Sequence, residues 1–192
     1  MKQFVEAIAL LAWVALCSEA YGQTNLLNGL LTIFGPVREA YLKIVVDPAA
    51  KAQSIKRLQR LSDRLGTLAN DKRTLTEDVL SALKDDPRPQ AQIELVETAN
   101  ALRDRVREVR LALADVFAPL PTELEQRGGD VQRTLELNFT TKWEDLNAIG
   151  KELRLDTPSL DAIKSESEEM LKTINTIRGQ VNQLIQEISD RK

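Results

Sequence analysis

Few side chains in this 192-residue sequence are of the types that catalyse reactions. The chain has no histidine, and its single cysteine is Cys17. Imidazole bases, disulfides within the chain and the usual zinc or copper sites are therefore excluded. Carboxylates, amines and hydroxyls remain, but they need a shaped pocket that shifts their pKa values before they act as acids and bases. No glycine-rich phosphate loop is present either. We expect a protein that is not an enzyme and has no cofactor.

Two pairs of adjacent acidic residues are the remaining candidates for metal binding. They are Asp85-Asp86 and Glu168-Glu169. Carboxylates bind hard cations, but a calcium loop spaces its oxygen ligands along the chain, and neither pair has such neighbours. We therefore expect no metal site.

A basic stretch between Lys51 and Arg73 is the first candidate for binding. It carries seven basic residues against two acidic ones, and Lys56, Arg60 and Arg64 repeat every four residues along one edge of a helix. With Arg57 they form a candidate site for anionic lipid headgroups, a sulfated glycan or an acidic partner. The favoured alternative is a solvated face whose charges are balanced by neighbouring acidic residues such as those at 166, 168 and 169.

A short apolar segment is the second candidate. Its members that share one helical face are Leu27, Leu30, Leu31 and Phe34, and Leu26 and Ile33 widen that face. Such a segment is either buried as a short helix that plugs one end of a helical bundle, or exposed as an arm that contacts lipid or a partner. The buried arrangement is favoured.

The sequence Asn138-Phe139-Thr140 is the only N-glycosylation sequon in the chain. In a secreted eukaryotic protein Asn138 would be a candidate glycosylation site, whereas in a bacterial protein the sequon is irrelevant.

The N-terminus has the zones of a secretory signal peptide. Lys2 precedes an apolar run from Ala7 to Leu16, and a small-residue cleavage pattern ends at Gly22. We expect residues 1–22 to be cleaved off and residues 23–192 to form a single secreted, extracellular domain; cleavage after Ala20 is the rival site. Loss of the signal changes the net charge from −3 to −2, so no nucleic-acid partner is expected.

Hydrophobic periodicity and capping residues predict helices throughout residues 23–192. Asp47-Pro48 and Thr157-Pro158 each place a capping residue before a proline, and capping-box patterns begin at Thr122 and Thr74. The predicted helices cover residues 36–46, 48–84, 89–117, 123–154 and 158–190. Gly128-Gly129 is a candidate break in the fourth of these segments, and Asn70-Asp71 is a candidate bend in the second.

The last predicted helix has the clearest apolar stripe, because its apolar residues alternate three and four positions apart with only Ser167 polar. This stripe consists of Leu160, Ile163, Ser167, Met170, Ile174, Ile177, Val181, Leu184 and Ile188. Similar stripes are expected at Leu58, Leu61, Leu65 and Leu68, and at Leu102, Val106, Val109, Leu113 and Val116.

These elements predict an all-α fold in which four long helices form an antiparallel up-down-up-down bundle, with a short helix before them. The connections around residues 85–88, 118–122 and 155–157 are too short for crossovers, so consecutive helices should be neighbours. Stability must come from the packing of Leu, Ile, Val and Ala, because disulfides are excluded.

Two functions from different classes follow from this architecture. The favoured one is an extracellular interaction module for a protein or glycan partner. The alternative is a lipid carrier, because the chain over residues 24–190 resembles the exchangeable apolipoproteins, especially those of insects: secreted, free of disulfides and built from amphipathic helices joined by short turns. The resemblance is one of architecture and implies binding to a lipid surface. A third hypothesis is a dimer formed through the apolar stripe of residues 160–188. Binding of an apolar ligand inside the bundle is a further alternative.

Overall fold

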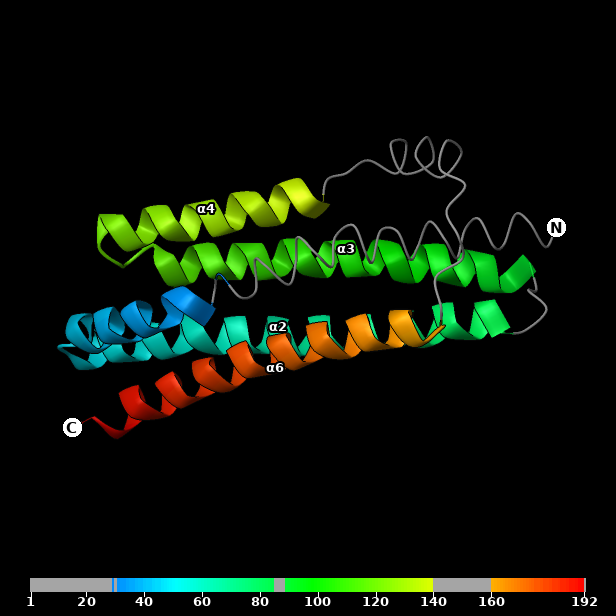
Figure 1. The fold of residues 1–192 in the computed structure, drawn as a ribbon. Helices are drawn as coiled ribbons and strands as arrows, with labels where there is room; N and C mark the ends of the chain where they lie inside the picture. Colours follow the sequence, from blue (N-terminus) through cyan, green and yellow to red (C-terminus); the bar gives the residue numbers. More distant parts are fainter. Residues whose placement is uncertain (1–28, 30, 85–88, 140–159, 192) are drawn as a thin grey trace.

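The structure is a computed structural model that describes residue 29 and residues 31–84, 89–139 and 160–191. All regular secondary structure in these residues is helical, so the predicted all-α class is confirmed for them. The elements are an N-terminal helix over residues 31–44, α2 (Pro48–Lys84), α3 (Pro89–Phe117), α4 (Thr122–Phe139) and α6 (Leu160–Asp190) (Figure 1). The structure describes the predicted fourth helix only as far as residue 139, and the predicted cap at Thr157 lies outside the described residues.

Helix α2 begins as the sequence predicts. The Oδ1 atom of Asp47 accepts hydrogen bonds from the backbone amides of Ala49 and Ala50, both at 2.8 Å. The carbonyl of Asp47 accepts the first helical bond from the amide of Lys51 at 2.9 Å. Asp47 is therefore the N-cap, and Pro48 occupies the first helical position, where its missing amide proton costs nothing.

The two predicted capping boxes, at Thr122 and Thr74, are wrong. At the start of α4, the amide of Glu125 bonds to the carbonyl of Pro121 at 3.0 Å, which makes Pro121 the N-cap and Thr122 the first residue of the helix. Thr74 lies inside α2, which runs on without a new start, and its hydroxyl donates to the carbonyl of Asn70, four residues earlier. A hydroxyl that bonds back in this way is compatible with a continuous helix.

Glycine and proline do not break the helices where the sequence suggested. The N-terminal helix passes through Gly35 and Pro36, although the predicted helix begins only at residue 36. Ile33 before these residues and Val37 after them are both buried in the same core, and their burial outweighs the backbone hydrogen bond that a proline removes. Helix α4 likewise continues through Gly128-Gly129.

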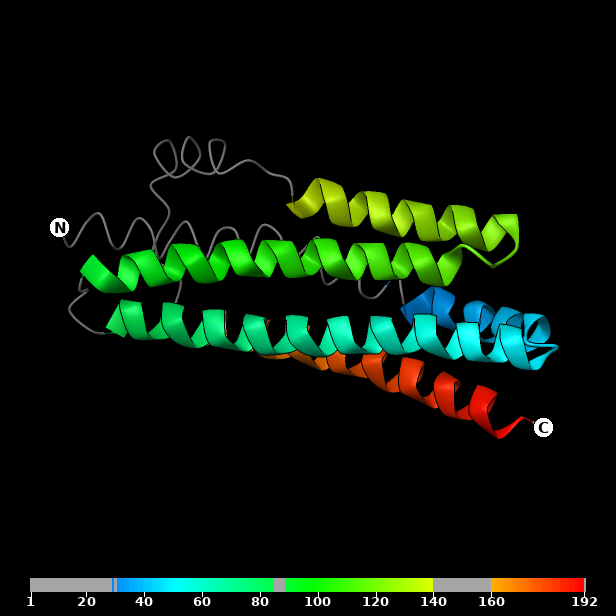
Figure 2. The ribbon, with the colours of Figure 1, turned by 180° about the vertical axis from the view of Figure 1, so that it is seen from behind.

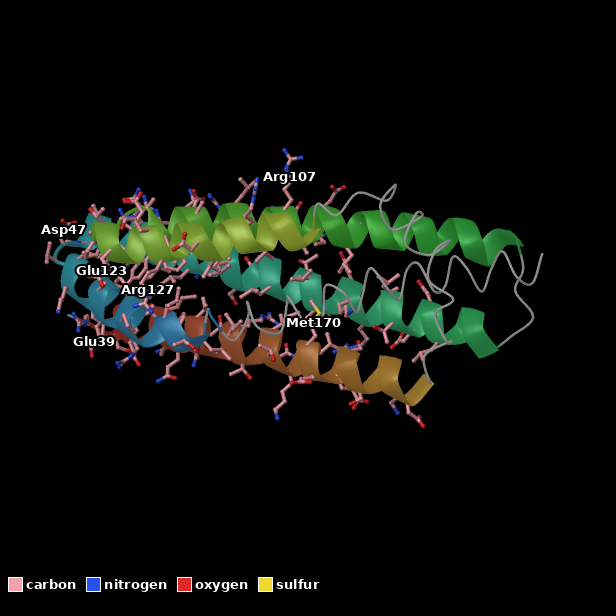
Figure 3. The ribbon with its side chains drawn as sticks, turned by 45° about the horizontal axis from the view of Figure 1, so that its top comes forward. Glu39, Asp47, Arg107, Glu123, Arg127 and Met170 are labelled. Atoms are coloured by element: carbon pink, nitrogen blue, oxygen red, sulfur yellow. The ribbon has the colours of Figure 1, made fainter. Side chains whose placement is uncertain are left out.

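The predicted apolar stripes form the core wherever their side chains are described. In α6, the residues from Met170 to Ile188 on the stripe are at most 2% exposed, and Ser167 is buried with them. The predicted leucines of α2 and the predicted valines and leucines of α3 are buried as well. Met170 lies between α2 and α6 in Figure 3, whereas Arg107 points away from α3 into solvent.

Helix α2 packs against both α3 and α6, and α4 packs against α3 (Figures 1 and 2). Polar contacts between α2 and α6 pair rising residue numbers with falling ones: Lys51 with Ser189, Ser62 with Asn182, and Thr76 with Ser167. The N-terminal helix lies at the end of the molecule where α2 begins and α6 ends, and it contacts both α3 and α6. The described residues are thus compatible with a helical bundle, in which this short helix takes a place beside the long ones.

Candidate interaction surfaces

Two of the four predicted basic residues make ion pairs within the chain. Arg60 pairs with Asp115, and Nη1 of Arg64 lies 2.9 Å from Oε2 of Glu108. Both acidic partners belong to α3, so the basic edge of α2 faces the neighbouring helix. Although these side chains are partly exposed, their charges are largely balanced by those of their partners.

Lys56 and Arg57 lie nearer the start of α2. Lys56 is exposed, Arg57 is half-buried, and no ion pair of either is found within the described residues. Burial raises the pKa of Tyr41, and the charge of Arg57 opposes that effect. Lys56 is therefore the member of the predicted group that is best placed to meet an external anion.

Two other basic residues of the same stretch, Lys51 and Lys72, are engaged within the protein. Nζ of Lys51 donates to the carbonyls of Ser189 and Arg191 at 2.7 and 2.6 Å. These carbonyls belong to the C-terminal end of α6, where a positive charge is favourable. Lys72 is only 3% exposed. These two lysines of the basic stretch therefore contribute to the fold rather than to the predicted binding surface.

A charge network between α2 and α3 was not foreseen from the sequence. Nε of Arg105 lies 3.0 Å from Asp71, and its Nη1 lies 3.1 Å from Glu108, which also binds Arg64. The hydrogen bond to Asp71, together with the one to Glu108, raises the pKa of Arg105. Arg64 and Asp71 are spaced to share one face of α2, and Arg105 and Glu108 are spaced to share one face of α3. The sequence does not reveal that these two faces meet.

The predicted apolar segment is described only in part. Leu27 and Leu30 lie outside the described residues, whereas Leu31 and Phe34 are partly buried and pack against the core. The side chains most deeply buried in the N-terminal helix are instead Ile33, Val37, Ala40 and Tyr41. In its described part, the segment is packed against the bundle rather than extended away from it.

Polar contacts fix this helix at both of its neighbours. The hydroxyl of Tyr41 donates to the carbonyl of Val116 at 2.6 Å, in the last turn of α3. Nε of Arg38 donates to Oε2 of Glu187 on α6 at 2.8 Å. The first bond satisfies a carbonyl that a helix end leaves without a partner, so the tyrosine links two helices at a buried point.

Helix α2 and helix α6 share a buried polar contact. The hydroxyl oxygens of Thr76 and Ser167 lie 2.7 Å apart, and both residues are buried. Thr76 donates its only hydroxyl proton to the carbonyl of Lys72 at 2.8 Å, so Ser167 is the donor to Thr76. The single polar position in the predicted stripe of α6 therefore has a matching partner on α2.

The structure does not bring the remaining candidates from the sequence together into a site. Asn138 lies in the last turn of α4, but its side chain and Thr140 are outside what the structure describes. Asp85 and Asp86 are outside it too, and Glu168 and Glu169 are exposed on α6. Within the described residues, no three acidic side chains converge as metal ligands would.

In the described part of the chain, every helix is too short or too polar to span a lipid bilayer. No protein-family model matches the chain, and neither does any curated protein or solved structure.

Proposed function

We propose that the protein is a secreted, non-enzymatic helical bundle that acts in its closed form as an extracellular binding module for a protein or glycan partner. The single observation that carries this proposal is the buried hydrogen bond between Ser167 and Thr76. A satisfied polar pair inside an apolar interface favours one alignment of the two helices, because any slip leaves a hydroxyl without its partner.

Contacts at the edges of α2 support the same closed arrangement. On the α6 side, the hydroxyl of Ser62 donates to Asn182 at 2.7 Å. On the α3 side, the ion pairs of Arg60, Arg64 and Arg105 occur at successive heights along the helix. Both sets pair early residues of one helix with late residues of the other, as expected if four long helices run up, down, up and down.

The alternative is a lipid carrier that opens and lays its apolar stripes on a lipid surface. Opening would separate Thr76 from Ser167 and would break the α2–α6 contacts, so Ser167 would lose the acceptor of its hydroxyl proton on α2. Because the closed form satisfies these groups, we favour the binding module over the lipid carrier. The proposal also includes glycosylation of Asn138 and a contact between Lys56 and an anionic group of the partner.

A disulfide across α2 and α6 distinguishes the two functions. The two hydroxyl oxygens lie 2.7 Å apart, so the side chains at these positions point at each other, and Thr76→Cys with Ser167→Cys should form a disulfide on oxidation. This bond holds the bundle shut. Both forms are mixed with phosphatidylcholine vesicles and with vesicles that also contain phosphatidylglycerol, and turbidity and co-flotation are recorded.

We expect neither the oxidised nor the reduced form to clear or to float with the vesicles. Binding of the labelled protein to cells that carry its partner should be equal in both forms. Clearance by the reduced form alone would instead establish the lipid carrier, since only the reduced form can open. The single variant Ser167→Cys is the control for the loss of the buried hydrogen bond.

Secretion has a separate test. When the full chain is expressed in secreting cells, we expect the protein in the medium to begin at Gln23. A mass that corresponds to residues 21–192 would identify the rival cleavage site, and retention of the intact chain inside the cells would contradict secretion.

A further inference from the structure

The outer face of α6 carries a second stripe with heptad spacing. Its positions alternate four and three residues apart, as in the buried stripe, but every one of its members is exposed. Exposed residues at this spacing begin with Asp161, Ser165 and Glu168, and the part that follows, which we call the outer stripe, consists of Lys172, Thr176, Gly179, Gln183, Gln186 and Asp190. Because a helix has about 3.6 residues per turn, the outer stripe lies on the side of α6 opposite the buried Val181.

None of the described elements covers the outer stripe. Helix α6 packs against α2 along one side and meets the N-terminal helix through Glu187 on the other. It lies at the edge of the molecule in Figure 1, and Figure 2 shows it beside α2 from behind. A Cβ atom added at Gly179 would meet no heavy atom within 4 Å, so the space in front of this glycine is open.

The outer stripe is complementary to itself in only one direction. Its spacing reads the same from either end, so two copies of α6 that run in opposite directions keep every position in register. Lys172 then meets Asp190 of the partner subunit, and Gly179 meets Gln183 of the partner subunit. In a parallel pair each residue would meet its own copy, which places lysine against lysine and aspartate against aspartate.

Local contacts prepare the charged ends for such a pair. Nε2 of Gln186 donates to both carboxylate oxygens of Asp190, at 3.0 and 3.1 Å, and holds that carboxylate on the outer face. Lys172 makes no ion pair within the described part of the chain. Nε2 of Gln183 donates to Oε1 of Glu187 at 3.1 Å, so this side chain lies along its own helix, and the open space at Gly179 lets the two helices approach closely.

We propose that a second copy of this chain docks on the outer stripe, as an antiparallel, two-fold symmetric α6–α6 dimer. The two-fold axis duplicates each contact, so the interface contains two Lys172–Asp190 pairs and two Gly179–Gln183 contacts. This dimer differs from one formed through the apolar stripe of residues 160–188, because the described part of that stripe is already buried inside the chain. The dimer leaves the closed bundle unchanged and does not depend on which partner the module binds.

Charge reversal tests the pairing of the ends. Sedimentation equilibrium of the expressed protein should show a monomer–dimer equilibrium that weakens at high salt. Lys172→Glu alone, or Asp190→Lys alone, should weaken dimerisation by about tenfold, because each places two like-charged pairs across the axis. The double variant Lys172→Glu with Asp190→Lys should restore it. A monomer at all concentrations, or a double variant no tighter than the single ones, would overturn the proposal.

Cross-linking tests the direction of the helices. Gly179→Cys and Gln183→Cys are made separately in a Cys17→Ser background, and the two proteins are oxidised alone and as an equal mixture. An antiparallel dimer predicts a disulfide mainly in the mixture, between one copy of each variant. Disulfides that form mainly between identical variants, or none at all, would contradict the proposed register. Gly35→Cys, at another exposed helical glycine with open space, is the control for random collision.

Discussion

At the scale of single residues, Gly128 allows α4 to lie directly on the ring of Phe117. A Cβ atom at position 128 would be 2.3 Å from Cγ of that ring, far inside van der Waals contact. Phe117 is itself only 3% exposed, so its ring has little room to move away. The glycine is therefore required by the approach of α4 to α3 rather than by any unusual backbone angle.

Replacement of this glycine gives a direct test. Gly128→Ala should lower the free energy of unfolding by about 1–2 kcal/mol, because the overpacking outweighs the gain in helix propensity. Hydrogen exchange should also accelerate in α4. The matched control is Gly129→Ala, because a Cβ atom there meets nothing within 4 Å and the change should stabilise the helix by about 0.5–1 kcal/mol. Urea titrations of both variants measure the difference, and equal effects would mean that the Phe117 contact is absent.

The two glycines also show what residue-level inference can reach. The sequence marks Gly128-Gly129 as unusual in a helix, and the prediction of a break there was wrong. The true reason for Gly128 is a contact with Phe117, which belongs to the preceding helix. Spacing along one helix cannot reveal such a contact, because it depends on which faces of two helices meet.

At the scale of elements, α2 and α3 are joined by a charge network with Arg105 at its centre. Arg105 links Asp71 on α2 to Glu108 on its own helix, and Glu108 also binds Arg64. Exposed ion pairs that act singly contribute little, but a network positions several side chains at once. The network therefore adds more to the alignment of the two helices than to the total stability.

Arg105→Gln should consequently lower the urea midpoint, and so should Asp71→Asn. The double variant should be no less stable than the less stable single variant, because both changes remove the same link. Arg107→Gln is the control, since Arg107 is exposed and points away from α3 in Figure 3. Strictly additive effects of the two changes would show that the residues do not interact in solution.

Element-level prediction succeeded where apolar periodicity was strong and failed where a local signal competed with packing. The stripe of α6 and the N-cap at Asp47 were predicted correctly, because each depends on residues within one helix. The start of the N-terminal helix was missed, because Gly35-Pro36 resembles a helix boundary whereas burial on both sides carries the helix through it. The partners of Arg60 and Arg64 on α3 were also not predicted, although a face whose charges are balanced by neighbouring acidic residues was.

At the scale of the whole molecule, two titratable groups that hold the N-terminal helix set opposite limits on stability. Burial raises the pKa of Tyr41 above its ordinary value of 10.0, and the hydrogen bond from Arg38 lowers the pKa of Glu187 below 4.5. Above about pH 10 the unfolded chain loses the tyrosine proton while the folded chain keeps it, so stability falls as the pH rises. Below about pH 4.5 the unfolded chain gains the glutamate proton first, so stability falls as the pH drops.

Unfolding free energies measured in urea between about pH 3 and 11 should therefore form a plateau with a decline on each side. Tyr41→Phe should flatten the alkaline decline and leave the acid one unchanged, and it should cost about 1–3 kcal/mol at neutral pH because the carbonyl of Val116 loses its buried donor. Arg38→Gln should flatten only the acid decline, because Glu187 then titrates near its ordinary pKa. Apart from Tyr41 and Arg38, the three proteins share every titratable group, so differences between the curves isolate the two contacts. If both variants kept both declines, the N-terminal helix would not be docked in solution as these contacts require.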